Sequence, residues 1–536
     1  MTNVVIFLAD DLGYSDLGCY GGEIKTPNLD LLANNGIRMS NFHNTPRCSP
    51  SRASLLTGLH PHQTGMGILA KDDSEHGGYT GKLNDRCITL AEILKQEGFT
   101  TAIRGKWHLT PSNHIPDDAW PLARGFDSFY GTMTGCGTYY QPGTLTRGTE
   151  NIEHEADRED FFYTDVIADE SVDFLKSHKA SNPDKPYFLY VPFTAPHWPL
   201  HARENTIKEY DGVYEAGWDA LRDTRLARQQ GLGILPSYLE LSPRDPGVPS
   251  WEDEAFQEWQ VRRMAVYAAM VTEMDQAIGR ILDQIKENGD WEDTVILFIS
   301  DNGASADPMP LVELQYWKQR TDILRHKTKD GRDVRIGNDP LVMPGGEDTY
   351  LSYGRGWANL SNTPFRLFKL WAHEGGVAAP FIAHWPKGNL RNGEIFHQPF
   401  QLTDVVPTIL ELLGANYPAE RAGKALPPLV GQSMFQTWKG ADVANPTLWW
   451  EHCGNAAIRS GQWKLVRQYD CPWELYDIDT DRSEIHDVSA KHPDVVKDLA
   501  AQWEKIATEN GVIPFRQIME IYDNKNLVMN AYLAIQ

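Results

Sequence analysis

The sequence lacks any long hydrophobic run. No window of its 536 residues approaches the uninterrupted stretch of about 20 apolar residues that a membrane-spanning helix needs. Residues 1–9 also lack the basic segment and long apolar core of a signal peptide, and acidic residues follow at once. We therefore expect a cytoplasmic protein with no membrane partner, or a periplasmic one if a signal has been trimmed from this chain.

Cysteine is scarce as well. The chain holds six cysteines at scattered positions, with no Cys-x-x-Cys pair. This argues against a disulfide scaffold, a zinc site and thioredoxin-like chemistry. Cys453 and Cys471 could pair across neighbouring strands, but their spacing alone does not decide it.

Basic residues are outnumbered by acidic ones. Fifty Lys and Arg face 73 Asp and Glu, which gives a formal net charge of −23. Such a field repels nucleic acid and anionic membrane surfaces, so we expect neither as a partner. An anionic substrate would need a local cluster of basic side chains. The chain also has neither a phosphate-binding Gly-rich loop nor a Gly-x-Ser-x-Gly elbow.

Short apolar runs alternate with helix-like segments. The clearest runs are residues 4–9, 188–191, 295–299 and 380–383. Continuous runs of this length are typical of strands buried on both faces of a largely parallel sheet. Residues 90–98 and 264–287 have the apolar spacing of helices, and Asn288-Gly289 is a plausible C-cap. This alternation predicts an α/β fold in which helices sandwich a large, mostly parallel sheet.

The pattern changes beyond about residue 415. Residues 456–459 and 463–466 flank Ser-Gly-Gln and predict a β-hairpin, with a further strand at 473–477 and a helix at 493–508. This region reads as a small antiparallel α+β unit.

We accordingly predict two domains, a catalytic α/β domain over residues 1–415 and a smaller antiparallel α+β domain over residues 416–536. Residues 202–260 and 304–360 look like long insertions in the connections of the sheet, and long connections are often functional.

Two of the predicted strands end in acids. The first is followed by Asp10-Asp11 and the strand at 295–299 by Ser300-Asp301-Asn302. Ligands collect at the carboxyl ends of strands in open α/β sheets, and this oxygen set suits Ca²⁺ or Mg²⁺. A lone Asp here would more often be a turn former or helix cap. With both pairs in matching positions, the metal site is the favoured interpretation.

Cys48 begins a second distinctive segment. Pro50 suits the first turn of a helix, which puts Cys48 and Arg52 on one helical face. A helix N-terminus attracts anions through its free N–H groups and its dipole. On this pair alone, a small buried cysteine beside a surface charge would be the better explanation.

The surrounding residues carry a resemblance to a known family. Cys48-x-Pro50-Ser51-Arg52 followed by Thr57-Gly58 resembles the signature of type I sulfatases, formylglycine-dependent arylsulfatases of the alkaline phosphatase superfamily. Further motifs follow in family order: Ala9-Asp10-Asp11-Leu12-Gly13, Gly105-Lys106-Trp107-His108, Ala195-Pro196-His197-Trp198-Pro199 and Ser300-Asp301-Asn302-Gly303. The insertion between residues 210 and 270 is similar to that of bacterial arylsulfatases of the Pseudomonas type. The fold that this implies is alkaline phosphatase-like.

The resemblance implies a cofactor and a modification. One Ca²⁺ would be held by the family's ligand positions, which here are Asp10, Asp11, Cys48, Asp301 and Asn302. Cys48 would be oxidised to formylglycine by a formylglycine-generating enzyme, which is then a maturation partner.

The same resemblance implies a mechanism. A hydroxyl of the hydrated aldehyde attacks sulfur and forms a covalent sulfate hemiacetal. Arg52 neutralises that hydroxyl and Lys106 binds a sulfate oxygen. His197 and Lys369 supply or steer the proton for the leaving alcohol, and His108 removes the proton whose loss expels sulfate.

Each of these residues has a structural alternative. Lys106 and His108 both reach a site only if the chain turns after its strand. His197 lies in a Pro-rich loop that could be purely structural. The spacing of Leu367, Leu370 and Trp371 could make Lys369 a solvated position on a helix. Val377-Ala378-Ala379 departs from the family's usual Ile-Arg-Val without touching a ligand.

The predicted activity is hydrolysis of sulfate monoesters, most simply aryl sulfates. One alternative is a phosphonate monoester or phosphodiester hydrolase of the same superfamily, but such relatives typically have Asp-His in place of Asp301-Asn302 and lack Gly-Lys-Trp-His. Another is a noncatalytic protein that binds sulfated ligands, if Cys48 stays a thiol. Five aromatic residues could wall an aryl substrate or belong to the core: Tyr316, Trp317, Tyr350, Tyr353 and Trp357. The sequence does not predict the oligomeric state.

Overall fold

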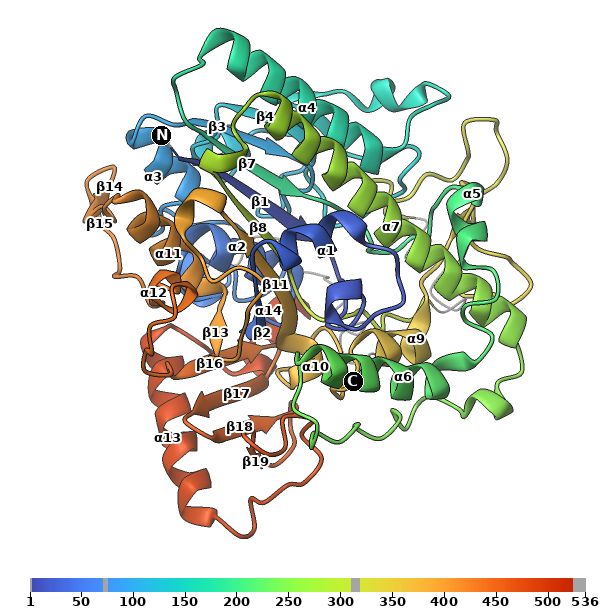
Figure 1. Cartoon of the computed structure of the whole chain (residues 1–536), viewed down its shortest axis with the longest axis vertical. Coiled ribbons are helices and arrows are strands. Elements are labelled where there is room, and N and C mark those ends of the chain that lie inside the picture. Colours follow the sequence, from blue (N-terminus) through green and yellow to red (C-terminus); the bar gives the residue numbers. More distant parts are fainter. Residues whose placement is uncertain (1, 71–75, 310–318, 524–536) are drawn as a thin grey trace.

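The computed structural model describes residues 2–70, 76–309 and 319–523 (Figure 1). Eleven strands form one central sheet, in the order β12-β2-β11-β8-β1-β7-β3-β4-β5-β6, with β13 also paired to β2. The strands are β1 (Asn3–Ala9), β2 (Ile37–His43), β3 (Thr100–Arg104), β4 (Ser128–Thr132), β5 (Leu145–Arg147), β6 (Glu150–Asn151), β7 (Tyr187–Pro192), β8 (Thr294–Ser300), β11 (Ala378–His384), β12 (Ile395–Phe396) and β13 (Phe400–Gln401).

The middle of this sheet is parallel. β8, β1, β7, β3 and β4 all run in one direction. β11 is antiparallel to both of its neighbours, β8 and β2. The predicted large, mostly parallel sheet is confirmed, and the four apolar runs all become strands. The direction of β11 was not predictable, because a continuous apolar run carries no mark of strand direction.

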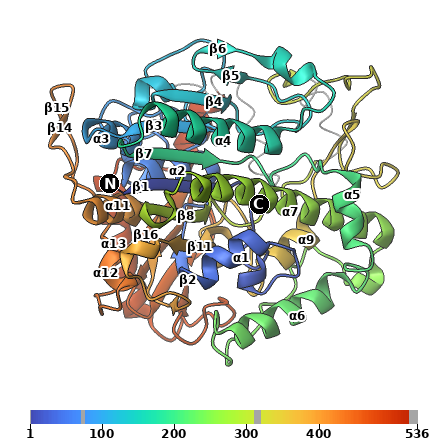
Figure 2. The same ribbon diagram turned by 45° about the horizontal axis from the view of Figure 1, so that its top comes forward.

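Helices cover both faces of the sheet. Along β1, Val5 and Phe7 point into the core shared with α4 (Tyr163–Ser181) and α7 (Gln257–Glu287). Val4 and Ile6 point into the core shared with α2 (Cys48–Thr57) and α3 (Leu90–Gln96). Figures 1 and 2 show α4 and α7, together with α1 (Pro27–Asn34), on one side of the strands, and α2 and α3, together with α11 (Val405–Leu413), on the other. Because both faces are covered, the strand needs apolar residues at every position.

Both predicted helices are confirmed. Residues 90–96 form α3, and residues 264–287 belong to α7, which begins earlier, at Gln257, and ends at Glu287 with Asn288 as its C-cap. Residues 202–260 contain α5, α6 and the start of α7, and α6 packs on α9. Among the described residues up to 438, the α-helices are α1 (Pro27–Asn34), α2 (Cys48–Thr57), α3 (Leu90–Gln96), α4 (Tyr163–Ser181), α5 (Glu204–Ile207), α6 (Gly217–Leu232), α7 (Gln257–Glu287), α9 (Gly354–Ser361), α10 (Glu374–Val377), α11 (Val405–Leu413) and α12 (Phe435–Trp438).

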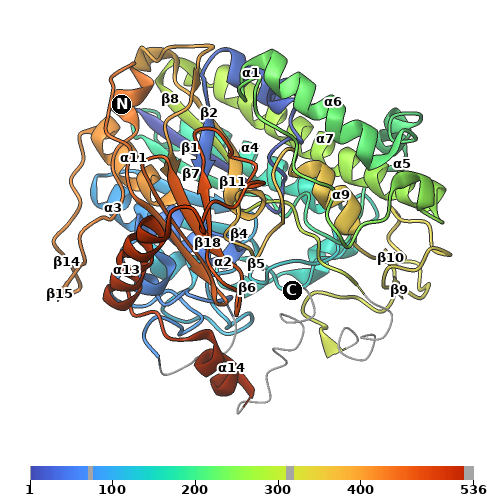
Figure 3. The same ribbon diagram turned by 90° about the horizontal axis from the view of Figure 1, so that it is seen from below.

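A smaller antiparallel sheet follows in the C-terminal part of the chain. Its strands, in order, are β16 (Leu448–His452), β17 (Asn455–Ser460), β18 (Trp463–Arg467) and β19 (Glu474–Asp477). One face packs against α13 (Pro493–Glu509), as Figure 3 shows, and the other against Ala372 and Val377 of the preceding chain. The predicted hairpin, third strand and helix are confirmed, whereas the boundary at residue 415 stays a prediction.

The remaining elements are short. They are a parallel pair, β9 (Arg335–Ile336) with β10 (Thr349–Tyr350), an antiparallel pair, β14 (Glu420–Arg421) with β15 (Lys424–Ala425), and the last helix, α14 (Phe515–Asp523). In the described ranges, no helix combines the length and the apolar character that crossing a membrane requires. All six cysteines are free, with Cys453 buried and Cys471 exposed, so the pairing considered above is not formed.

Candidate active site

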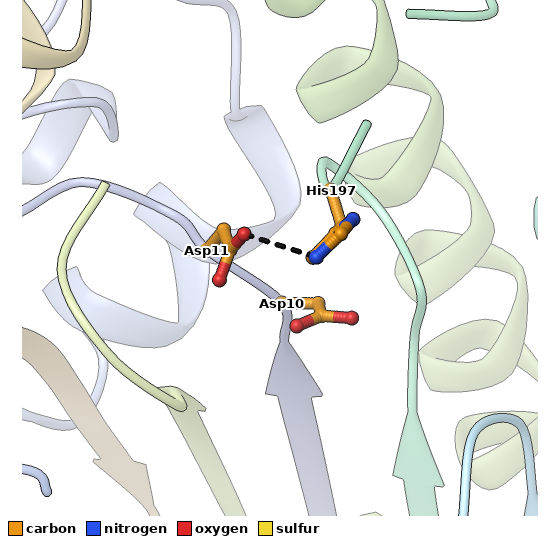
Figure 4. A group of neighbouring side chains, drawn as sticks. All are labelled: Asp10, Asp11 and His197. Carbon is orange, nitrogen blue, oxygen red and sulfur yellow. Dashed lines mark ion pairs between the residues drawn. The ribbon is translucent and has the colours of Figure 1, made fainter. Parts of the chain in front are cut away.

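Four adjacent parallel strands deliver the candidate residues to one edge of the sheet. In the order β8-β1-β7-β3, the chain after each strand carries Asp301-Asn302, Asp10-Asp11, His197, and Lys106 with His108. The register pairs Ala9 with Ser300, so the two acidic pairs leave the sheet side by side. Figure 4 shows Asp10 just beyond the tip of β1, with Asp11 and His197 facing each other across the edge.

Left-handed backbone at three positions turns these side chains toward one another. Asp11 has a φ of 64° and His108 a φ of 56°, values that L-residues rarely adopt. Gly105 has a φ of 132°, and a Cβ there would meet Pro192 O at 2.0 Å, so only glycine fits. The turn that Lys106 and His108 need in order to share a site is therefore present.

Each of three buried carboxylates has its own cation. Lys106 Nζ lies 2.5 Å from Asp10 Oδ2, and Lys369 Nζ lies 2.8 Å from Asp11 Oδ2. Arg52 Nη2 donates to Asp301 Oδ2 at 2.9 Å and lies 3.7 Å from Asp10 Oδ1. Pairing of this kind offsets the cost of burying a charge. The local basic cluster that an anionic substrate needs against the net charge of −23 is thus present.

The pKa values of these acids diverge. Burial alone would raise the pKa of Asp11, but Lys369 and His197 hold it well below its usual range. Burial and the neighbouring Asp10 carboxylate raise the pKa of Asp301 to about 7, despite the opposing effect of Arg52. Two carboxylates this close repel each other, and a cation between them would relieve that repulsion.

The oxygen atoms at this edge fit a hard divalent cation. Asp10 Oδ1 and Asn302 Oδ1 are buried and have no hydrogen-bond partner among the residues that the structure describes. Asp11 Oδ1 accepts one hydrogen bond from the described residues, from the Asn302 amide at 2.7 Å. Potential ligand atoms of Asp10, Asp11 and His197 also lie within 4.8 Å of one another. A buried oxygen without a partner is costly, and a coordinated Ca²⁺ or Mg²⁺ would satisfy these two.

Cys48 stands where the sequence predicted, as the first residue of α2. Its Sγ lies 3.5 Å from His108 Nδ1, and the side chain is almost completely buried. Arg52, one turn further along, also donates to Lys106 O at 3.1 Å. Burial, followed by Lys106 and Arg52, lowers the pKa of His108 well below its usual value. His108 is therefore neutral and can accept a proton.

His197 and Lys369 form a pair. Lys369 Nζ lies 3.3 Å from His197 Nε2, and His197 Nδ1 lies 2.7 Å from Trp198 O. Because a carbonyl only accepts, Nδ1 carries the proton and Nε2 offers a lone pair to Lys369. Burial lowers the pKa of His197 to about 3, whereas Asp11 helps to keep Lys369 charged. The proton available to a leaving group is thus held by Lys369.

The helical alternative for Lys369 is wrong. This residue lies in the segment between α9 and α10 and is 3% exposed. Leu367 and Leu370 have φ values of 64° and 94°, which break any helix. Lys369 N donates to Ala304 O at 3.0 Å, which ties this segment to the one that carries Asp301.

Two residues at the site were not predicted. Asp307 Oδ2 accepts from Trp198 Nε1 at 3.1 Å and lies 3.8 Å from Lys369 Nζ. Burial opposes ionisation of Asp307, but Lys369 lowers its pKa. Asn362 accepts from Ala304 N and donates to Leu367 O, which clamps the segments carrying Asp301 and Lys369. Trp198 lies in the motif Ala195-Pro196-His197-Trp198-Pro199, but no local sequence pattern marks Asp307 or Asn362.

The aromatic residues considered as a substrate wall belong mostly to the core. Trp357 is fully buried against Trp218 and Trp251, and Tyr353 stacks on Tyr267 with ring centroids 4.3 Å apart. Tyr350 is also buried, with its ring 6.0 Å from that of Trp198. Tyr316 and Trp317 lie outside the described residues.

Comparison with known proteins agrees with this geometry. A sequence model of the family described as Sulfatase matches residues 2–415, and one described as N-sulphoglucosamine sulphohydrolase, C-terminal, matches residues 365–509. An uncharacterised sulfatase of Schizosaccharomyces pombe is 33% identical over 95% of this chain and 94% of its own length. An arylsulfatase of Klebsiella aerogenes is 33% identical over 81% of this chain and 91% of its own length.

A solved structure is similar throughout. The crystal structure of Ps i-CgsB superimposes with a TM-score of 0.68 at 24% identity and covers 98% of both chains, which supports the fold. The family generally uses formylglycine and a divalent metal. The chain belongs to the sulfatase family, as a type I sulfatase of the alkaline phosphatase superfamily, and is a sulfuric ester hydrolase.

Proposed function

We propose that this sulfatase acts on aryl sulfates and that residue 48 works as formylglycine, made from Cys48 by a formylglycine-generating enzyme. The observation that carries the proposal is the contact of Cys48 Sγ with His108 Nδ1, at 3.5 Å, at the N-terminus of α2. The hydrated aldehyde would supply a hydroxyl nucleophile, which a thiol in this place does not.

We further propose that the divalent metal is Ca²⁺. Asp10, Asp11, Asp301 and Asn302 would hold it, with residue 48 contributing an oxygen after modification. The two unpartnered oxygens, Asp10 Oδ1 and Asn302 Oδ1, support this assignment. The ion would supply positive charge for a sulfate oxygen. His197 lies close enough to Asp10 and Asp11 to be a metal ligand and not a residue that steers a proton. Its Nε2, however, already accepts a hydrogen bond from Lys369 Nζ.

Arg52 and Lys106 would bind the sulfate group. Both are completely buried, and their carboxylate partners fix their positions. Arg52 would neutralise the attacking hydroxyl and Lys106 would bind a sulfate oxygen as charge moves onto it. Donors that are already in place when this charge develops lower the barrier most effectively.

Departure of the alcohol would depend on Lys369. Its Nζ is charged and oriented between Asp11 and His197, so a proton can pass from Nζ to the leaving oxygen, directly or through His197 Nε2. Release of sulfate would depend on His108. As a neutral base beside residue 48, it would accept the proton of the remaining hydroxyl.

The aryl preference has two supports. The Klebsiella aerogenes relative carries the name arylsulfatase. Trp198 also lies against His197, with ring centroids 4.5 Å apart, and can present an aromatic face beside the leaving group. The match to the C-terminal model named for N-sulphoglucosamine sulphohydrolase favours a second candidate, a sulfated amino sugar.

A substrate panel tests the proposal. The kcat/KM values would be measured for 4-nitrophenyl sulfate, 4-nitrophenyl phosphate, a phenyl phosphonate monoester and an N-sulfated glucosamine. We expect the aryl sulfate to have the highest value. A higher value for the phosphonate would favour the phosphonate hydrolase alternative, and a higher value for the amino sugar would reject the aryl preference.

A further inference from the structure

A cleft of about 940 Å³ lies apart from the active site, on the outer side of β2. Its walls come from five regions distant in sequence: β2, the segment after α6, the segment around β12, the segment after α12, and the C-terminal sheet with its following turn. Figure 1 shows the segment after α6 running toward β18 and β19. Tyr238 OH donates to Asp479 O across this meeting point. None of the active-site candidates lines the cleft.

Arg459 of β17 is the unusual residue of this cleft. It is 4% exposed, yet within the described part of the chain its guanidinium makes a single hydrogen bond, from Nη1 to Asn41 Oδ1 at 2.8 Å. Nε is buried without a partner, and no carboxylate lies within ion-pair distance among the described residues. Burial lowers the pKa of Arg459 to about 10. A buried guanidinium with so few acceptors is costly unless something else supplies them.

The neighbouring charges do not neutralise Arg459. Arg482, which also lines the cleft, donates from Nε to Glu374 Oε2 and from Nη1 to Ser40 O. Glu374 in turn accepts Lys464 at 2.8 Å, and Lys464 also reaches Glu484. Two carboxylates thus balance Lys464 and Arg482. Arg459 has no carboxylate of its own at ion-pair distance among the described residues, and Glu374 and Asp479 act on it only from further away.

The rest of the lining suits the body of an organic molecule. Leu235, Leu239, Phe396 and Ile478 form apolar walls, and Glu394 on the rim is paired with Arg391 at 2.7 Å. Asp442 and Asp479 are exposed at the mouth, where water and salt screen their charge. A hollow that combines apolar walls with a few fixed polar or charged groups is the usual form of a small-molecule site.

We propose that this cleft binds the oxyanion group of a small amphipathic molecule, a carboxylate, sulfonate or phosphonate held by Arg459 with its apolar body against Leu235 and Phe396. The site is separate from the sulfate ester site. The N–H groups of Arg459 that do not contact Asn41 would donate hydrogen bonds to the anion, while Asn41 keeps the guanidinium in position.

Binding of three six-carbon probes, hexanoate, hexane-1-sulfonate and hexylphosphonate, would test this by calorimetry on the full chain. We expect at least one anion to bind and hexylammonium not to bind. Arg459→Gln should weaken the anion at least tenfold, and Arg459→Lys should restore part of the loss. The comparison among the three head groups identifies the preferred oxyanion. Absence of binding by all three probes would overturn the proposal.

Matched variants separate this cleft from the active site. Arg228→Gln, on the exposed face of α6, removes the same charge elsewhere and should leave binding unchanged. Arg52→Gln should also leave hexanoate binding within twofold of the parent. If Arg52→Gln abolished binding and Arg459→Gln did not, the anion would occupy the active site and the proposal would be wrong. Ala441→Trp places a large side chain at another residue of the lining, so it should weaken binding even if Arg459→Gln fails to fold.

Discussion

His108 Nδ1 lies 3.5 Å from Cys48 Sγ, and the imidazole is held neutral by burial and by the cations around it. In the proposed reaction this base acts only after the alcohol has left. His108→Gln should therefore lower kcat by about 100-fold or more, while the first turnover still releases phenol. Rapid-mixing experiments with 4-nitrophenyl sulfate should show a burst of about one equivalent of phenol. A normal steady state, or the loss of the burst together with kcat, would contradict this role.

The Lys369–Asp11 contact predicts a dependence on the leaving group. Lys369→Gln removes the proton held near the departing oxygen, so alkyl sulfates should suffer more than 4-nitrophenyl sulfate, whose phenolate leaves without help. The measurement is kcat/KM for a series of aryl sulfates whose leaving phenols have rising pKa values. The plot of log kcat/KM against the pKa of the phenol should be steeper for the variant than for the wild type. An equal loss for every ester would mean that Lys369 only binds or positions.

The unpartnered oxygens of Asp10 and Asn302 predict that the metal stabilises the fold. Removal of the metal with a chelator should abolish activity and lower Tm, and Ca²⁺ should restore both. Asn302→Ala should raise the Ca²⁺ concentration needed for the Tm increase by about tenfold or more. Thr508→Ala, which removes an exposed hydroxyl far along α13, is a suitable control and should not change it. If chelation left Tm and activity intact, the assignment would fail.

His201 predicts an acid-sensitive fold. Its Nε2 donates to Thr349 O at 2.6 Å and its Nδ1 accepts from Tyr139 N, which fixes the neutral form. Burial lowers its pKa to about 4. Because this lies below the unfolded value of about 6.5, the contribution is complete above pH 6.5 and is lost as the pH falls toward 4.

The free energy of unfolding of wild type and His201→Gln, measured in urea between pH 7 and 4.5, tests this. The variant should be less stable at pH 7. Its free energy of unfolding should fall less steeply with decreasing pH than that of the wild type, by up to about 1.4 kcal/mol per pH unit. Parallel slopes would show that His201 does not titrate on unfolding.

Glu374 links the two sheets through buried charges. It accepts Lys464 from β18 and Arg482, and His43 of β2 lies 3.2 Å away. Glu374→Gln leaves these cations short of an acceptor, so stability should fall by about 3–5 kcal/mol. Glu509→Gln, which removes an exposed carboxylate 4.0 Å from Lys505, should change it by less than about 0.5 kcal/mol. If both substitutions changed the free energy of unfolding by the same small amount, the buried charges around Glu374 would not be needed for stability.

The sequence predicts the parts of the molecule that depend on local pattern. Val4 to Ala9 is apolar at every position because both faces of β1 are covered, and the acids after it mark the strand end. Cys48 and Arg52 were placed correctly, since Pro50 and the four-residue spacing are local features of α2.

What the sequence could not supply depends on contacts between distant segments. Lys369 resembled a helix position, but Leu367 and Leu370 adopt left-handed conformations and the lysine is buried against Asp11. Asp307 becomes a site residue only because Trp198 and Lys369 reach it. Arg459 and Asn41 are 418 residues apart, so their contact has no local signature at all.

The most direct test of the account is the chemical state of residue 48. Tryptic peptides that contain this residue would be analysed by mass spectrometry in several preparations, together with kcat for 4-nitrophenyl sulfate. We predict that the peptide carries an aldehyde in place of the thiol, and that kcat rises in proportion to the modified fraction. A fully active preparation whose residue 48 is entirely unmodified cysteine would contradict the account.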